Sequence, residues 1–217
     1  MRHHTRTDRA FTLIELLTVI AIIAILAGLL FPAIKSALVR AEVVRAQNGI
    51  ANLSHAFTAY YTEYGKWPIN DIAPLTTYNT YIIDQNFVAL LQGANPSTPP
   101  NASGYPYPNS SGAFQTIGSA TLQGNPRGIH FLDFKAADLD GTGSFVDPWK
   151  KPYYCRFDFS YTNSVQDPFT GGSVQPTNLN AGFLIWSAGP DNQYDNNGDS
   201  IPNQIPSLVN KDNVKSW

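Results

Sequence analysis

A nearly uncharged apolar run from Phe11 to Ile34 constrains this chain more than any other feature, and its one ionisable residue is Glu15. A helix crosses a bilayer with ~20 apolar residues, so the run is long enough to span a membrane. A cleavable secretory signal is one alternative, but its apolar core has roughly 7–15 residues, and no clean A-x-A site follows this run. A buried helix of a soluble core is another, and the lack of charges over such a length disfavours it. The sequence therefore predicts a membrane span.

A carboxylate inside this run needs an explanation. An acidic residue at the centre of a membrane helix costs ~2.5–3.5 kcal/mol on insertion scales, and less near a helix end. Glu15 lies near the start of the run, so one interpretation is that its side chain reaches the lipid headgroups. The other interpretation is a charged partner, which must come from another chain or from a newly formed amine because the run contains no basic residue.

The segment RAFTLIELLTVIAIIAILAGLLFPAI resembles the N-terminal motif of type IV prepilins and type II secretion pseudopilins. The resemblance implies a short basic leader, Met1–Ala10, which a prepilin peptidase removes by cutting between Ala10 and Phe11 before it methylates the new amine. It also implies that the Glu15 carboxylate pairs with the Phe11 amine of a neighbouring subunit and so fixes the register of assembly. Ala10 departs from the family, which usually has Gly before the cut.

Beyond Pro32 the pattern becomes amphipathic and predicts that the helix continues to about Tyr64. Apolar residues recur at alternating spacings of four and three, which places them in one stripe of a helix. These residues are Val39, Val43, Ala46, Ile50, Leu53, Phe57, Tyr60 and Tyr64. The repeat also fits a coiled-coil seam, but the alanine and the tyrosines in it favour packing against the chain's own sheet. Gly65 and Pro68 predict the helix end.

The remaining chain predicts a small sheet with long loops. Alternation of apolar and polar residues predicts a half-buried strand at Tyr153–Tyr161, and Phe183–Trp186 predicts the next strand, with a long hairpin loop over 162–181. Residues 69 to about 125 are rich in Pro, Asn, Ser, Thr and Gly, which predicts irregular loops and a short helix near Asn86–Gln92. The DPW-x-x-PY segment, the aromatic strand and the S-x-G-x-D turn resemble the major (G-type) pseudopilin of type II secretion.

The expected fold class is α+β, with a pilin-like fold in which a long N-terminal helix, transmembrane in its first half, packs on a small antiparallel sheet. The expected organisation is a leader peptide at 1–10, a transmembrane or filament-core helix at 11–34, its amphipathic continuation at 35–66, and a globular head at 67–217. Within the head we expect a variable loop region at about 69–130, the sheet at about 145–187 and an acidic C-terminal loop at 188–217.

The acidic loop contains a cluster of carboxylates with Asn and Gly between them: Asp191, Asp195, Asp199 and Asp212. Oxygen donors on a flexible loop suit Ca²⁺, which takes about six to eight of them, although the same residue types also serve ordinary surface turns. The resemblance to the major pseudopilin implies a calcium ion held by Asp191 and Asp212, with Asp195 and Asp199 as further candidates. It also implies that a backbone carbonyl near Ser187 helps to bind the ion. The loop is longer than the family's.

Composition excludes several classes of function. The formal net charge is −2 without a basic stripe, so we expect no nucleic-acid partner. Cys155 is the only cysteine, which excludes an internal disulfide and CxxC sites. His55 and His130 are isolated, and the sequence has no nucleophile elbow, phosphate loop or H-E-x-x-H motif. We therefore expect a structural protein and not an enzyme.

The resemblance implies a subunit of a type II secretion pseudopilus, which assembles through its N-terminal helix and drives protein export across the outer membrane. The expected partners are further copies of the chain, minor pseudopilins, an inner-membrane assembly platform, prepilin peptidase and the membrane, with calcium as cofactor. The expected location is the inner membrane, crossed once, with the head in the periplasm. Two alternatives remain: a type IV or orphan surface pilin that serves adhesion or DNA uptake, and a membrane-anchored binding module that does not polymerise.

Overall fold

The computed structural model describes residues 13–71, 80–94, 105–108, 114–117, 120–169, 177–190 and 214–217. The chain divides into two compact units, Met1–Ala41 and Glu42–Trp217, and helix α1 (Leu13–Tyr64, 52 residues) contributes to both. The second unit is called the head below.

In the first unit, the described side chains of α1 are exposed. Residues 13–31 and 34–41 are all exposed, with Leu13 at 81% and Phe31 at 76%. By length and composition the helix is able to cross a membrane, and none of its most apolar window is buried. Among the described residues this part of the helix is therefore unlike a buried core helix, and its exposed apolar side chains suit lipid or another apolar surface.

In the head, the Glu42–Tyr64 part of α1 has one buried face. Ala46, Ile50, Leu53, Phe57 and Tyr60 are each at most 4% exposed. The predicted stripe is confirmed over these residues, and the stripe packs against the chain's own head as expected.

The helix ends where the sequence predicts. Gly65 adopts a φ of +67°, a conformation that costs a residue with a side chain but not glycine. Its N–H donates to the carbonyl oxygen of Tyr61 at 2.7 Å, which satisfies one of the last free carbonyls of the helix.

The side of α1 that carries Ser54, Thr58 and Thr62 has a repeated hydrogen-bond pattern. The hydroxyls of Ser54, Thr58 and Thr62 donate at 2.8 Å to the carbonyls of Ile50, Ser54 and Thr58, respectively. Each hydroxyl proton is therefore bonded within the helix itself.

The short helix α2 (Gln85–Leu91) confirms the helix predicted near Asn86–Gln92. The carboxylate of Asp84 accepts hydrogen bonds from the backbone N–H groups of Asn86 and Phe87, which caps the helix start. A buried apolar face then holds α2 against the core.

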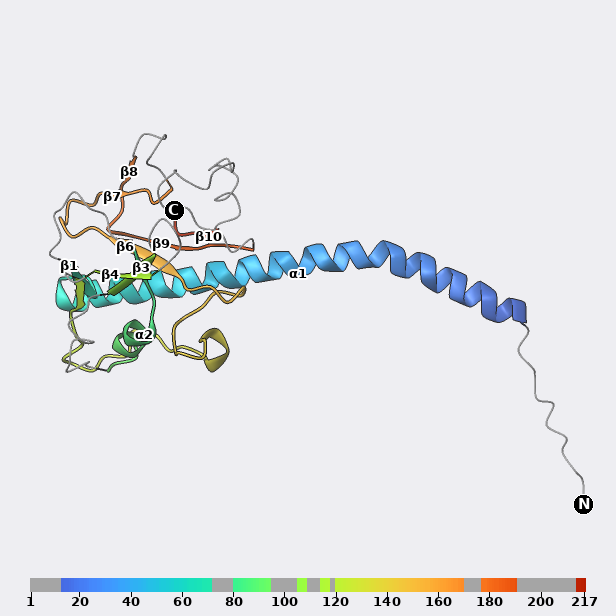
Figure 1. Cartoon of the computed structure of the whole chain (residues 1–217), viewed down its shortest axis with the longest axis horizontal. Coiled ribbons are helices and arrows are strands. Elements are labelled where there is room, and N and C mark those ends of the chain that lie inside the picture. The colour runs from blue at the N-terminus through green and yellow to red at the C-terminus, as the bar shows by residue number, and fades with distance from the viewer. Residues whose placement is uncertain are drawn as a thin grey trace, which may run out of the picture. The chain divides into compact units, whose positions relative to one another are not determined.

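An antiparallel four-stranded sheet in the order β10-β9-β6-β2 forms the centre of the head. Its strands are β2 (Tyr81–Ile82), β6 (Tyr154–Phe157), β9 (Phe183–Ser187) and β10 (Val214–Lys215). Further antiparallel pairs are β1 (Ile69–Asp71) with β5 (Ala120–Leu122), β3 (Tyr105–Pro108) with β4 (Phe114–Ile117), and β7 (Val165–Gln166) with β8 (Asn178–Leu179). A 3₁₀ turn, η1, covers Ala136–Asp138. In Figure 1 the sheet lies on one side of the head part of α1 and α2 lies on the other.

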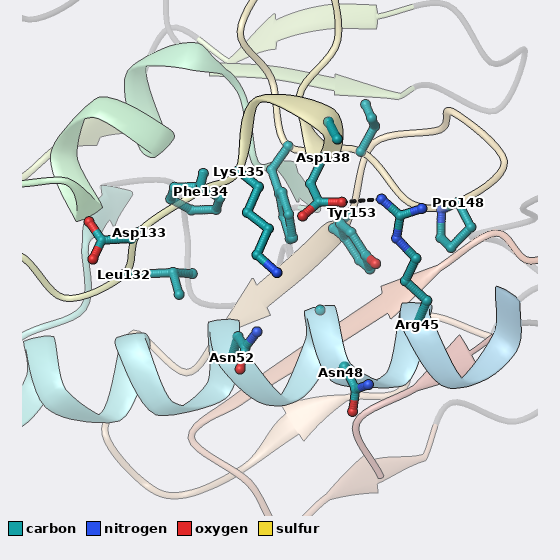
Figure 2. Close-up of a pocket in the computed structure, with 14 residues that line it drawn as sticks. Arg45, Asn48, Asn52, Leu132, Asp133, Phe134, Lys135, Asp138, Pro148 and Tyr153 are labelled. Atoms are coloured by element: carbon teal, nitrogen blue, oxygen red, sulfur yellow. Dashed lines mark hydrogen bonds and ion pairs between the residues drawn. The ribbon is translucent and has the colours of Figure 1, made fainter. Parts of the chain in front are cut away.

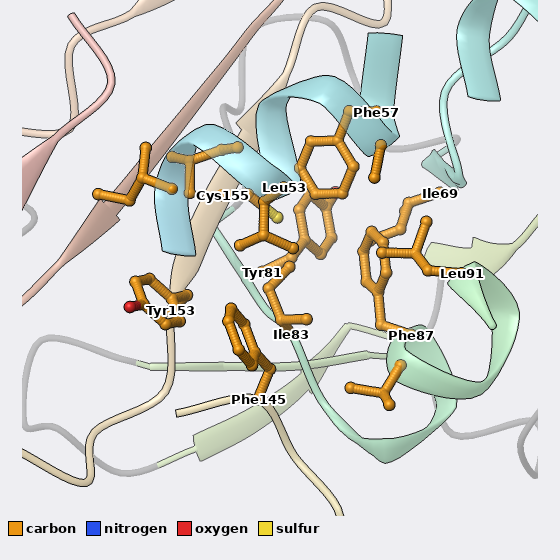
Figure 3. Packing of buried hydrophobic residues seen from close by; sticks show 14 of the residues in the cluster. Leu53, Phe57, Ile69, Tyr81, Ile83, Phe87, Leu91, Phe145, Tyr153 and Cys155 are labelled. Atoms are coloured by element: carbon orange, nitrogen blue, oxygen red, sulfur yellow. The ribbon is translucent and has the colours of Figure 1, made fainter. Parts of the chain in front are cut away.

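The main apolar core lies between α1, α2 and the sheet. Figure 3 shows Leu53 and Phe57 of α1 pointing toward Phe87 and Leu91 of α2. The Phe57 ring centroid lies 5.5 Å from that of Phe87 and 5.0 Å from that of Phe157 on β6, in the tilted arrangements that aromatic rings favour. Aromatic contacts therefore join all three elements.

The prediction of a half-buried strand over Tyr153–Tyr161 is wrong in two respects. The strand itself is shorter, and its nominally outward residues are also buried, with Tyr154 at 7% and Arg156 at 5% exposure. The cause is a second apolar cluster on the other face of the sheet. Its buried members are Ile82, Tyr154, Val165, Leu184, Trp186 and Ala188.

Arg156 is tolerated inside because it is hydrogen-bonded. Its Nε donates to the hydroxyl of Thr80 at 2.9 Å and its Nη1 to the carbonyl of Gln166 at 3.3 Å. A buried guanidinium without such acceptors would be costly.

The regions predicted as loops contribute more to the sheets than expected. β2 comes from the predicted loop region, β10 from the predicted acidic loop, and the 162–181 connection contains the β7–β8 pair. Strands of two to four residues are too short to produce an alternating pattern in sequence.

Candidate functional site

Glu15 lies in the first turn of α1. A carboxylate at this position stabilises the helix because it faces the positive end of the helix dipole. Its backbone carbonyl accepts a hydrogen bond from the Thr18 hydroxyl at 2.9 Å, and the residue is exposed within this single chain. The two other predicted assembly residues, Ala10 and Phe11, lie outside the described residues.

Aliphatic side chains surround Glu15 on all sides of the helix. Among them, Ile14 is 70%, Leu16 is 59% and Leu17 is 55% exposed. Leaving apolar area in water costs roughly 25 cal/mol per Å². A surface of this size is stable only in lipid or against other apolar helices, and there a carboxylate needs a charged or hydrogen-bonding partner.

The predicted calcium ligands Asp191, Asp195, Asp199 and Asp212 lie outside the described residues. No group of three or more His, Cys, Asp or Glu side chains that suits a metal is present in the part of the chain that the structure describes. Both ends of the loop are nonetheless defined. Ser187 on β9 pairs with Val214 on β10, so the chain enters and leaves the 191–213 segment side by side.

Ser187 is held by the buried carboxylate of Asp147, which the sequence indicated only as part of the D-P-W turn. Its hydroxyl donates to Oδ2 of Asp147 at 2.5 Å and accepts a hydrogen bond from the Gly189 N–H at 3.1 Å. Asp147 is 2% exposed, and its Oδ1 also accepts from the N–H groups of Trp149 and Lys151. Burial raises the pKa of Asp147, while these hydrogen bonds act in the opposite direction.

The same turn connects to the helix. The indole Nε1 of Trp149 donates to Oε2 of Glu42 at 3.0 Å, and the Tyr153 hydroxyl donates to the Ala46 carbonyl at 3.4 Å. The DPW-x-x-PY segment therefore binds α1 at one end and the start of the acidic loop, through Asp147, at the other. The sequence signal for this role was the short-range D-P-W turn. The distant partners of this segment, on α1 and at Ser187, were not predictable from the sequence.

The residue types that often carry catalysis are placed unfavourably for it. Cys155 is fully buried in β6, and burial raises the pKa of its thiol well above the usual value, which keeps it protonated. His55 is exposed, and His130 lies 3.6 Å from the carboxylate of Asp133 at the surface.

Comparisons with known proteins identify the N-terminal segment. Residues 5–31 match the family described as "Prokaryotic N-terminal methylation motif". The type IV major pilin protein PilE1 of Neisseria gonorrhoeae is 44% identical over 64 residues, which is 30% of this chain and 39% of that protein. The fimbrial protein EcpC of Eikenella corrodens is 38% identical over 68 residues, or 31% of this chain and 44% of that protein.

The matched segment covers only about two fifths of the length of these relatives. A fimbrial protein of Neisseria meningitidis matches over a similar share, with 43% identity over 64 residues, which is 38% of its length. No solved structure matches this chain. The findings support a type IV prepilin-like protein, and the relatives matched are pilin and fimbrial proteins.

Proposed function

We propose that this type IV prepilin-like chain is the repeating structural subunit of a filament, assembled through the N-terminal part of α1. One observation carries the proposal: α1 buries a face of its Glu42–Tyr64 part in its own head, whereas residues 13–31 are exposed and largely apolar. Such a surface is suited first to lipid and then to the same surface of neighbouring copies.

The assembly chemistry rests on two residues. Removal of the leader between Ala10 and Phe11 would create a new amine at Phe11, four residues before Glu15. In an apolar surrounding the attraction between this amine and the Glu15 carboxylate of the next subunit is strong, while an unpaired carboxylate is costly. A subunit placed out of register would leave this carboxylate unpaired, which destabilises that arrangement and favours the correct position.

We further propose that the filament is the pseudopilus of a type II secretion system. The support is the head: the DPW-x-x-PY turn, the β6–β9 strand pair and the Ser187 turn occur together, as the resemblance to the major pseudopilin implies. The subunit would be held in the inner membrane with its head in the periplasm. Its partners would be minor pseudopilins, an assembly platform and prepilin peptidase.

A type IV pilin is the second candidate, and the comparisons are equally consistent with it. The matched relatives are named type IV major pilin and fimbrial proteins, although the match is confined to the N-terminal third of this chain. On this proposal the head would be displayed at the cell surface and would serve adhesion or DNA uptake.

Two measurements in the source organism test these proposals. Mass spectrometry of the mature protein should find a methylated Phe11 at its start; retention of Met1 would instead favour a membrane-anchored module that does not polymerise. Deletion of the assembly ATPase of the secretion system should abolish both filaments and protein export. If export continues and surface filaments are lost only on deletion of the pilus ATPase, the pilin proposal replaces the pseudopilus proposal.

We also propose that the acidic loop binds a structural calcium ion. The donor set consists of carboxylates and a backbone carbonyl near Ser187, which suits Ca²⁺, and the β9–β10 pairing brings the two flanks of the loop together. Asp191 and Asp212 would hold the ion, with Asp195 and Asp199 as further candidates. The ion would hold together a loop that has little apolar core of its own.

Thermal melting of the full chain in detergent tests the calcium proposal. The midpoint should rise by several degrees with millimolar CaCl₂ and fall with chelator, and Asp191→Asn or Asp212→Asn should remove this response. Asp167→Asn is the matched control, because Asp167 directly follows β7 and is not among the proposed calcium ligands. An unchanged midpoint in the wild-type chain would remove calcium from the account without affecting filament assembly.

A further inference from the structure

The head contains a pocket that neither assembly nor calcium binding uses. It has a volume of about 340 Å³ and lies between α1 and the segment 132–138. This volume is within the range of small-molecule sites. Figure 2 shows residues of its lining, with Arg45, Asn48 and Asn52 on α1 and Lys135 and Asp138 on the segment opposite the helix.

The base of the pocket is rigid and apolar. The rings of Phe145 and Tyr153 stack with centroids 4.7 Å apart and are 7% and 2% exposed. Gly49 of α1 also lines the pocket, and a Cβ at this position would lie 2.4 Å from the Tyr153 hydroxyl oxygen. A glycine inside a helix costs about 1 kcal/mol relative to alanine, and here it lets the tyrosine approach the helix. These contacts define the base of the pocket before any ligand arrives.

The rim presents hydrogen-bond donors and one unneutralised positive charge. Lys135 reaches from the 132–138 segment toward α1, and its ammonium group points into the space between Asn48 and Asn52 (Figure 2). All three side chains are exposed and line the pocket. Within the described residues, none of the three makes a side-chain hydrogen bond to another part of the protein.

The other charges around the pocket are already compensated or point elsewhere. Arg45 forms an ion pair with Asp138. The Asp133 side chain is 91% exposed and lies 3.6 Å from Nδ1 of His130. The charge that remains available to a ligand is therefore that of Lys135, with the two amides beside it.

We infer that this pocket binds a small organic monocarboxylate. The Lys135 ammonium would pair with the carboxylate, the side-chain amides of Asn48 and Asn52 would donate hydrogen bonds to it, and an apolar body would lie over Leu132 and Phe134. A carboxylate accepts several such hydrogen bonds, and charge-assisted ones are the strongest.

The same features exclude the competing ligand classes. A cation would be repelled by Lys135, and of the two carboxylates in the lining, Asp138 is paired with Arg45 and Asp133 lies beside His130. A neutral sugar normally stacks on an open aromatic face, but the rings of Phe145 and Tyr153 are buried, and Phe134 is itself partly buried. A phosphate dianion would need a second uncommitted cation, and Arg45 is held by Asp138.

Equilibrium dialysis of the full chain in a zwitterionic detergent, with radiolabelled benzoate as the probe, tests this inference. We expect saturable binding of benzoate to the wild-type chain and at least tenfold weaker binding to Lys135→Met. Asn52→Asp should weaken binding by a similar factor, because the substitution keeps the shape of the Asn52 side chain but places a negative charge beside Lys135. Lys151→Met and Gln47→Glu are the matched controls, because neither residue lines the pocket, and both should bind like the wild type.

Benzamide and inorganic phosphate complete the experiment. Benzamide, which has the shape of benzoate without its charge, should compete at least tenfold less well. Phosphate should compete more weakly than unlabelled benzoate. The inference is overturned if the wild type binds no benzoate, if Lys135→Met binds it as well as the wild type, or if benzamide or phosphate displaces it as effectively as benzoate does.

Discussion

The apolar residues of helix α1 have two different environments along its length. In the Glu42–Tyr64 part, Leu53 and Phe57 are fully buried by the sheet and by α2. In the part before Ala41, residues of the same kind, such as Leu26 and Leu29, are 53% and 72% exposed. One helix thus contains a part that packs into its own head and a part whose described side chains are exposed.

Under the proposed function, residues of the buried part stabilise the head, and residues of the exposed part contribute to assembly. A substitution in the covered part changes the free energy of unfolding of the head. A substitution in the uncovered part leaves the head intact and changes what the helix binds. The predictions below use this separation, from the largest expected effect to the smallest.

The largest effect is expected from Glu15→Gln. It removes the charge inside the uncovered part and keeps the shape of the side chain. Breaking one partner of an ion pair in an apolar surrounding costs about 3–5 kcal/mol, which corresponds to roughly a hundredfold or more in affinity. We expect recovery of sheared filaments on immunoblots to fall by about this factor.

Two observations check that the effect of Glu15→Gln is specific. The mature protein should still begin at Phe11, and thermal melting of the head should be unchanged. Glu63→Gln, which removes a surface carboxylate paired with Arg127 in the head, should assemble normally. Normal filament yield from Glu15→Gln would refute the pairing mechanism.

Next is a matched pair of leucine truncations. Leu53→Ala in the covered part should lower the free energy of unfolding of the head by about 2–5 kcal/mol, because it removes a buried side chain and leaves a cavity. Leu29→Ala, in the uncovered part, should leave it unchanged. Urea denaturation of the full chain in detergent, followed by tryptophan fluorescence, measures both. Equal effects of the two truncations would contradict the division of the helix.

Two glycines give a smaller but sharper contrast. Gly49→Ala should destabilise the head by about 1–2 kcal/mol, because the steric cost of overpacking exceeds the gain of about 1 kcal/mol in helix propensity. Gly28→Ala should not shift the same transition, because nothing lies within 4 Å of its Cβ position. Gly49→Ala combined with Tyr153→Phe should recover part of the loss, since the Tyr153 oxygen is the nearest atom to the added methyl group.

The smallest effect concerns pH. Partial burial raises the pKa of Asp140, but hydrogen bonds from the Thr142 hydroxyl and from the N–H groups of Ser144, Thr142 and Gly143 outweigh it, so the net pKa lies below the usual 3.8. The folded pKa is lower than the unfolded one, so the stabilisation is present above pH 3.8 and is lost as the pH falls through the folded pKa. Because Asp140 is exposed, solvent screens these interactions, so Asp140→Asn should cost less than about 1 kcal/mol at pH 7.

Urea titrations at pH 7 and pH 3 measure this difference. The free energies of unfolding of the wild type and Asp140→Asn should converge at the lower pH. A constant difference would show that the carboxylate charge does not contribute.

Local signals in the sequence predicted the long elements well. The stripe from Ala46 to Tyr60, the stop at Gly65 and the short helix near Asn86–Gln92 depend on contacts a few residues apart, and the structure confirms each of them. The motif around Phe11 is likewise local, and the methylation-motif match covers it.

Long-range features were not predictable in the same way. The burial of Tyr154 and Arg156 depends on a second apolar cluster whose members are far apart in sequence. The bond between Asp147 and Ser187 joins residues 40 positions apart, and the pocket around Lys135 combines a helix with a distant loop. Such sites arise from topology, which a linear pattern does not encode.

The hydroxyls of Ser54, Thr58 and Thr62 have one more consequence. Covering a polar surface is expensive when water must be stripped from protons that then find no acceptor. Here each proton already has an acceptor in the preceding turn of the helix. A partner that contacts this side of the head therefore need not supply acceptors for these three protons, although the hydroxyl oxygens still offer lone pairs to water or to a donor.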